Sequence, residues 1–259
     1  HLDLPQLWQD LNLSGDWQQG SSQSLFESEQ IDLSSANADE RYQLLQRTME
    51  RFEEAKTFGS LIEVPEGDAA PLKAMVEELE QLARTGDVMQ KPAAEMLLPY
   101  VQQARVLAQR YDSVIANPPY MGGKGMNARL KDFAKKSYPD AKSDLFAIFI
   151  ERGFELLRPY GFNAMVTMQS WMFLSSYEKL RLKILKESSI ECMVHMANMV
   201  MGIAFGTAAT VCKKAGSPLT RGAYCFVEYE DIGDDGRPVQ FPPLNERNLK
   251  AAKQNELAE

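Results

Sequence analysis

The sequence predicts an α/β protein in which a mostly helical, acidic segment precedes a partly parallel sheet. Apolar residues recur at helical spacing between residues 39 and 107. After residue 110, short β-branched runs alternate with amphipathic stretches, which is the order of strand, helix and strand in a parallel sheet. We therefore expect an insertion-like helical segment over residues 1–110, an α/β core over 111–214, and an extra strand with a polar tail over 215–259.

Three amphipathic helices are predicted in the first segment, after a loop rich in Ser, Gln and Gly over residues 15–24. They cover residues 39–58, the stretch between Asp68 and Gly86, and a stretch that begins at Pro92. Pro99 should kink or split the third helix, because an internal proline removes a backbone hydrogen bond. None of the three carries recognisable chemistry, so core packing or the docking of a partner is their expected role.

A proline-locked turn follows the first predicted strand. Ser113 to Ala116 is a short, mostly apolar run, so we expect a buried strand with Asn117 at its tip. Pro118 and Pro119 each fix φ near about −65°, and a proline after Asn117 pushes that residue out of the helical region. The result is a stiff turn that presents an amide side chain, backbone carbonyls and the Tyr120 ring at one place.

These groups suit the binding of an exocyclic amino group of a nucleobase. Such an amine is a poor nucleophile because its lone pair is conjugated with the ring. The Asn117 side-chain oxygen and the Pro118 carbonyl can accept its two hydrogens, which draws the nitrogen toward a tetrahedral geometry with its lone pair aimed at an incoming methyl group. Tyr120 would stack on the base, which has to leave the duplex for such chemistry.

The remaining elements continue the α/β pattern. Ser143 is expected to cap a helix that runs to about Leu157, and Ser175 and Glu178 are expected to form the capping box of another. Strands are predicted over Phe162–Met168, Ile190–Met196, Thr207–Cys212 and Ala223–Tyr229. Because ligands of such sheets bind at the carboxyl ends of the strands, Asn117 and Gln169–Trp171 should lie on one rim.

The net charge of −8 is unevenly distributed along the chain. Residues 1–100 hold 7 Lys and Arg against 19 Asp and Glu, whereas residues 101–214 hold 16 against 9 and residues 215–259 hold 5 against 8. Part of the basic charge clusters just after the turn, at Lys124, Arg129, Lys131 and Lys135. This cluster indicates either contact with DNA phosphates or an ordinary exposed helix face.

Composition excludes several other classes of protein. No stretch approaches the about 18 apolar residues of a membrane span, and no signal peptide is present, so a cytoplasmic location is expected. The three cysteines lack metal-ligand spacing, and His1 and His195 are the only histidines. No metal site is expected.

The turn Asn117-Pro118-Pro119-Tyr120 resembles the Asn-Pro-Pro-Tyr motif of amino-methyltransferases that use S-adenosylmethionine, above all DNA N6-adenine methyltransferases. With Met121–Gly125, Ser143–Phe146 and Gln169–Phe173, it resembles the PglX-type methyltransferases of BREX phage-defence systems over residues 100–215. The resemblance implies a partial Rossmann-like methyltransferase sheet and S-adenosylmethionine as the cofactor. It also implies double-stranded DNA and other phage-defence proteins as partners.

The resemblance also assigns site residues. Asn117, Pro118, Pro119 and Tyr120 match the catalytic motif, and Phe205 matches the aromatic residue that packs on the flipped base, although an ordinary core phenylalanine is an equal interpretation. The family's methyl-donor loop, an Asp-Pro-Ala-x-Gly-Ser-Gly-like sequence, does not occur in the chain and is expected before His1; a target-recognition domain is expected after Glu259. We therefore expect the isolated chain to be inactive.

Two other functions remain open. Protein-glutamine and RNA-guanine amino-methyltransferases use similar turns, because an amide or a guanine amine poses the same chemical problem. The chain could also be a non-catalytic DNA-binding or assembly module.

Replacing Lys124, Arg129 and Lys131 together by neutral residues should flatten the dependence of DNA affinity on salt concentration, because fewer counterions are then released on binding. Binding of the full-length protein to double-stranded DNA is measured over a series of salt concentrations. An unchanged slope would contradict phosphate contact by this segment.

Overall fold

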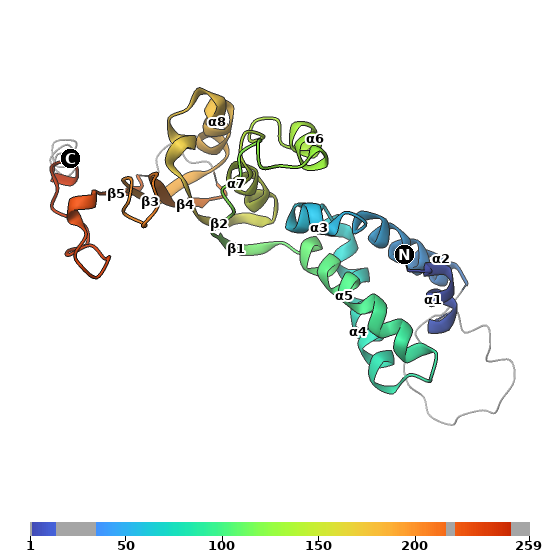
Figure 1. The fold of residues 1–259 in the computed structure, drawn as a ribbon. Coiled ribbons are helices and arrows are strands. Elements are labelled where there is room, and N and C mark those ends of the chain that lie inside the picture. Colours follow the sequence, from blue (N-terminus) through green and yellow to red (C-terminus); the bar gives the residue numbers. More distant parts are fainter. Residues whose placement is uncertain (1, 14–34, 216–220, 250–259) are drawn as a thin grey trace, which may run out of the picture. The chain divides into compact units, whose positions relative to one another are not determined.

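The computed structural model describes residues 2–13, 35–215 and 221–249, and the chain divides into two compact units, His1–Gln109 and Arg110–Glu259. The first unit is helical and the second contains a five-stranded sheet with helices (Figure 1). The α/β prediction is therefore confirmed. The loop predicted over residues 15–24 lies outside the described residues.

The helical unit is built around the pair α4 and α5, which run side by side (Figure 1). Its helices are α1 (Leu4–Leu11), α2 (Ser35–Arg51), α3 (Ala55–Phe58), α4 (Ala69–Thr85) and α5 (Gln90–Ala108). Two short 3₁₀ helices, η1 (Gly59–Leu61) and η2 (Glu66–Asp68), join α3 to α4. One continuous apolar core holds the unit together, with Leu72, Leu79, Leu97 and Val101 fully buried. This unit therefore has its own packed interior.

The predicted bounds of one helix are wrong, and of the kink or split expected at Pro99 the split does not occur. The helix expected over residues 39–58 ends at Arg51, because Phe52 turns into the core and its amide is shared between the carbonyls of Thr48 and Met49. Pro99 does not split α5. Residues on both sides of it, including Leu97 and Val101, are buried, and this burial outweighs the roughly 3 kcal/mol cost of an internal proline.

The sheet of the second unit has the order β1-β2-β4-β3-β5. Its strands are β1 (Tyr111–Ala116), β2 (Leu157–Met168), β3 (Ser189–Met196), β4 (Thr207–Lys213) and β5 (Ala223–Val227). β1 pairs with β2 in parallel and β3 with β5 in parallel, whereas β4 lies between β2 and β3 and is antiparallel to both. β3 and β4, which follow each other along the chain, are therefore antiparallel neighbours.

The two faces of the sheet differ in how far they are covered. Side chains alternate along β2 between buried and partly exposed positions, and the buried ones pack against α7 (Leu145–Glu155) and α8 (Glu178–Glu187). On the other face Phe162 is 40% exposed and Ile115 is 80% exposed. The prediction of a buried first strand is therefore wrong: β1 has a described partner on one side only, and Ile115 faces the less covered side.

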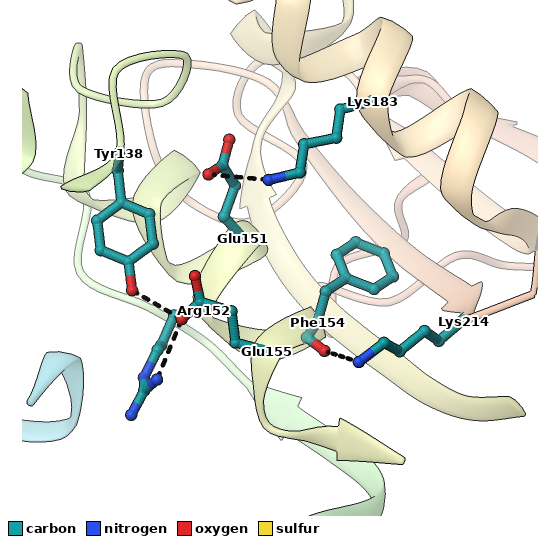
Figure 2. Close-up of polar contacts among 7 residues, drawn as sticks. All are labelled: Tyr138, Glu151, Arg152, Phe154, Glu155, Lys183 and Lys214. Carbon is teal, nitrogen blue, oxygen red and sulfur yellow. Dashed lines mark hydrogen bonds and ion pairs between the residues drawn. The ribbon is translucent and has the colours of Figure 1, made fainter. Parts of the chain in front are cut away.

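Polar contacts hold the C-terminal half of α7 in place (Figure 2). Lys214 Nζ donates to the carbonyl of Phe154, in the last turn of α7, at 2.7 Å and to that of Leu157, the first residue of β2, at 2.8 Å. Glu151 is buried, and burial raises the pKa of its carboxyl group while Lys183, 3.5 Å away, opposes that rise. The Glu155 carboxylate accepts from both Tyr138 and Arg152. The helix is thus fixed to the sheet and to the segment before it.

The helix starts differ from those predicted. α7 is capped by Asp144 instead of Ser143, because the Asp144 carboxylate accepts from the Phe146 amide. Ser175 to Tyr177 form a short 3₁₀ helix, so the capping box predicted for α8 does not form. Both differences depend on the path of the chain before each helix, which local sequence does not fix.

Candidate functional site

The turn after β1 lies beside the carboxyl end of β2. Ala116 is in register with Met165 on the neighbouring parallel strand, so Asn117 and Gln169 both follow strands that end at the same edge. Pro118 is buried, whereas Asn117 is exposed. The proline therefore anchors the turn and leaves the amide side chain accessible at the rim.

Tyr120 ties the turn to β2. Its hydroxyl lies 3.2 Å from the Val166 carbonyl oxygen and 3.3 Å from Asn117 Oδ1, so the proton can be donated to either acceptor. Burial raises the pKa of Tyr120, and the phenol stays a hydrogen-bond donor at neutral pH. The hydroxyl therefore restrains the Asn117 side chain at the position that the sequence assigned to the amine acceptor.

Two aromatic rings contact the Tyr120 ring. Phe146 of α7 meets it edge to face, with centroids 6.1 Å apart and an interplanar angle of 88°. Phe205, from the loop between β3 and β4, lies 5.7 Å away at 67°. The structure thus brings Phe205 to the turn although 85 residues separate it from Tyr120 in the sequence. A base sandwiched between Tyr120 and Phe205 would require the two rings to separate.

Asp144 joins the turn to the start of α7, and the sequence interpretation missed this role. Its Oδ1 accepts from the amide of Met121 at 2.9 Å and from the amide of Phe146 at 3.2 Å. The Leu145 amide donates back to the Met121 carbonyl at 3.0 Å. Met121, the residue directly after Asn117–Tyr120, is therefore held to the start of α7 by two hydrogen bonds, and the third caps the helix. The sequence offered one indication of this role, because Asp144 lies in the Ser143–Phe146 motif, but Ser143 was the predicted helix cap.

The glycine-rich loop Gly122–Gly125 is held by the same helix start. Gly122 bridges to Asp144, the Gly123 amide donates to the Ser143 carbonyl at 3.2 Å, and the Gly125 amide closes a turn onto the Gly122 carbonyl at 2.8 Å. Of the three glycines, only Gly125 is closely approached, because a Cβ atom there would lie 2.9 Å from Met121 Cγ, whereas Gly123 has open space around it. The loop has a defined conformation because Ser143 and Asp144 bind it.

Basic side chains follow on α6 (Ala128–Ser137), which Asn127 caps and which buries Leu130 and Ala134. Four of these residues were predicted to contact DNA. Lys124, Arg129 and Lys135 are exposed, and Lys131 is half-buried. Lys135 lies 3.9 Å from Asp132, and both side chains are well exposed, so this pair is weak. The four basic groups belong to one segment that adjoins the turn, and contact with DNA stays a prediction.

Near Asn117, the amides of Met121, Gly123 and Gly125 are already engaged within the chain, so none of the three is available to bind S-adenosylmethionine. We therefore assign no cofactor-binding residue. Among the described residues there is no cluster of three or more His, Cys, Asp or Glu that could hold a metal ion. In the same residues, no helix has the length and apolar character needed to span a membrane.

Comparison with known proteins shows clear similarity to adenine-specific methyltransferases. The model of the Eco57I restriction-modification methylase family matches residues 15–200. The adenine-specific methyltransferase BrxX of Escherichia coli O9:H4 (strain HS) is 47% identical over 262 residues, which cover 99% of this chain and 21% of that protein. The adenine-specific methyltransferase PglX of Lacticaseibacillus casei (strain Zhang) is 37% identical over 134 residues, covering 51% of this chain and 11% of that protein.

Among solved structures, one match is a putative class I S-adenosylmethionine-dependent methyltransferase from Listeria monocytogenes. Its TM-score is 0.39 at 12% identity, with 98% of this chain and 97% of the other covered. The sequence matches confirm the resemblance that the motifs predicted. The chain spans about a fifth of the length of the Escherichia coli relative.

Replacing Asp144 by Ala should lower the free energy of unfolding by about 1–3 kcal/mol, because the amides of Met121 and Phe146 lose their acceptor. Hydrogen exchange at the Met121 amide should accelerate about tenfold or more. Asp132→Ala, which removes an exposed carboxylate, is the matched control and should leave this exchange unchanged.

Asp144→Asn should reveal the cost of the buried charge. Burial raises the pKa of Asp144 although three backbone hydrogen bonds oppose the rise, so its favourable contribution is complete below the unfolded pKa of about 4 and is lost as pH rises through the folded pKa. The stability of the native protein relative to Asp144→Asn should therefore decrease as the pH rises above the unfolded pKa of about 4, as urea unfolding would measure. An increase over this range would contradict the burial argument.

Proposed function

Because the chain belongs to the Eco57I restriction-modification methylase family, we propose that it forms the amino-group-binding part of a DNA adenine-N6 methyltransferase. The full-length protein transfers a methyl group from S-adenosylmethionine to a flipped adenine in double-stranded DNA. It does so in the cytoplasm and serves phage defence with other phage-defence proteins. The observation that carries the proposal is the accessible Asn117 amide at a strand end, held beside the Tyr120 ring.

Asn117 and Pro118 act on the adenine amino group. Asn117 Oδ1 has two lone pairs, so it can accept one amine hydrogen while the Tyr120 hydroxyl occupies the other. The Pro118 carbonyl accepts the second amine hydrogen. Both contacts favour a tetrahedral nitrogen with an available lone pair and fix its direction. When bound, S-adenosylmethionine supplies an electrophilic methyl group on a sulfonium.

The aromatic residues receive the base. Tyr120 stacks on one face of the extruded adenine, and Phe205 moves from its edge contact with Tyr120 to pack against the same base. The contact between the two rings covers apolar surface when no base is present. Lys124, Arg129, Lys131 and Lys135 lie on the segment after the turn and bind phosphates near the extruded nucleotide.

Asn117→Ala in the full-length protein should reduce DNA methylation by about a hundredfold or more, because the acceptor whose contact strengthens as the nitrogen becomes tetrahedral is lost. The measurement is N6-methyladenine in DNA digested to nucleosides. Gln103→Ala, which truncates an exposed amide side chain on α5, serves as the matched control and should keep full activity.

This measurement also separates the alternatives. If methylated glutamine or guanine is found without N6-methyladenine, the same chemistry acts on another acceptor. Unchanged biological function in a folded Asn117→Ala protein would indicate a non-catalytic DNA-binding or assembly module.

The 259-residue chain alone should transfer no measurable methyl groups to DNA, because the amides after the turn are engaged and no donor loop of the expected type occurs in the sequence. Incubation with DNA and S-adenosylmethionine that carries a labelled methyl group tests this expectation, with the full-length protein as the positive control. Incorporation of label by the isolated chain would show that its donor site is complete.

A further inference from the structure

Gln169, the residue that follows β2, holds the residue next to Phe205. Its backbone amide donates to the Gly206 carbonyl at 3.0 Å, which extends the pairing of β2 with β4 by one hydrogen bond. Phe205 and Gly206 are adjacent, so their Cα atoms are about 3.8 Å apart. Whatever fixes Gly206 therefore restricts where the Phe205 ring can lie.

The Gln169 side chain also lies directly on Gly206. A Cβ atom added at Gly206 would approach the Cδ and Oε1 atoms of Gln169 to 2.5 Å and its Nε2 atom to 2.7 Å. Such distances do not occur between real Cβ atoms and their neighbours, so the glutamine side chain occupies the space that any larger residue at position 206 would need. A larger residue at position 206 would therefore displace the Gln169 side chain, whereas the backbone of Gly206 would not be strained, because its φ is not in the left-handed region.

His195 fixes the far end of the Gln169 side chain. The His195 Nε2 atom lies 2.6 Å from Gln169 Oε1, and the imidazole ring contacts Phe173 and Phe226. Burial, together with the nearby Arg247 charge, lowers the pKa of His195. The ring is therefore neutral at physiological pH, and the tautomer with a proton on Nε2 can donate to Gln169 Oε1.

The loop that carries Phe205 is otherwise attached at its start. The Ala197 amide donates to the Val227 carbonyl at 2.9 Å, and within the loop Met199 and Gly202 adopt positive φ angles of 68° and 70° around a tight turn. The first paired residues of β2 and β4 are Met168 and Thr207, and Thr207 directly follows Gly206. The contact with Gln169 is the last restraint before Phe205 enters the loop.

We propose that Gln169 is a positioning residue that, anchored by His195, holds Gly206 and thereby sets the place of the Phe205 ring beside the Tyr120 ring. The inference rests on the proposed function in one respect: Phe205 is taken to contact the extruded base. Gln169 itself does not touch the substrate and acts through Phe205. Its loss should affect capture of the extruded base and leave the affinity for duplex DNA unchanged.

The test uses the full-length protein and DNA that carries 2-aminopurine at the target adenine, whose fluorescence increases when the base leaves the stack. Gln169→Ala should reduce this increase by about fivefold or more, and should reduce the methylation rate to a similar extent on DNA that carries adenine at the same position, whereas the dissociation constant for DNA stays within about twofold. Gln169→Glu, which keeps the length and the acceptor for His195, should retain most of the signal. Unchanged fluorescence in Gln169→Ala would overturn the proposal.

Two double variants show whether Gln169 acts through its neighbours. Gln169→Ala combined with Phe205→Ala should be no worse than Phe205→Ala alone, because both changes remove one function. Gly206→Ala should reproduce the loss by displacing the Gln169 side chain, and adding Gln169→Ala should cause no further loss. Gly67→Ala, at a position with open space, is the control. Additive losses in the first pair, or full activity in Gly206→Ala, would overturn the proposal.

The two proposals fail in different ways. If Asn117→Ala retains N6-adenine methylation, the proposed chemistry is wrong whatever Gln169 does. If Asn117→Ala abolishes methylation but Gln169→Ala and Gly206→Ala extrude the base normally, only the positioning role is wrong. Thermal unfolding of each variant provides the fold control, and Gly206→Ala still tests the role if Gln169→Ala does not fold.

Discussion

The hydrogen bonds of Asp144 are the interaction on which the rest of the site depends. One carboxylate oxygen binds the amide directly after the Asn117–Tyr120 turn and also caps α7. Because Lys214, Lys183 and the Glu155 contacts fix that helix to its surroundings, the turn inherits the rigidity of the whole α/β unit. A turn locked only by its two prolines would have a fixed internal shape without a fixed position relative to β2. Hydrogen-bond acceptors that are held ready for a substrate need both a fixed shape and a fixed position.

Side chains from four separate parts of the chain lie at this rim of the sheet. The β1 turn supplies Asn117 and Tyr120, α7 supplies Phe146, the residue after β2 is Gln169, and the β3–β4 loop supplies Phe205. Parallel pairing of β1 with β2 brings the first and third of these to one edge, and the antiparallel β4 returns the last to the same edge. The mixed topology is therefore what allows aromatic residues from both halves of the unit to meet at Tyr120.

The prediction from sequence succeeded where the determinants are local. The turn, the strand before it and the helix between Asp68 and Gly86 follow from prolines, β-branched residues and helical periodicity within about 20 residues. It failed where a distant element decides: Ser143 and Asp144 are both good caps, and only the position of the Met121 amide selects Asp144. Likewise, Ile115 was assigned to the core because an apolar strand residue usually is buried, but the coverage of each sheet face is a property of the assembled unit.

By itself, the sequence determined the local character of the Asn117–Tyr120 segment. Two consecutive prolines between an amide and an aromatic ring define a stiff, acceptor-rich turn whatever surrounds them, because φ and the missing N–H groups are covalent properties of proline. Only the tertiary structure decided which residues serve that turn. The pairing of Asp144 with Met121, of Tyr120 with Phe205, and of Gln169 with His195 and Gly206 joins residues between 23 and 85 positions apart, and such contacts arise from strand order and register.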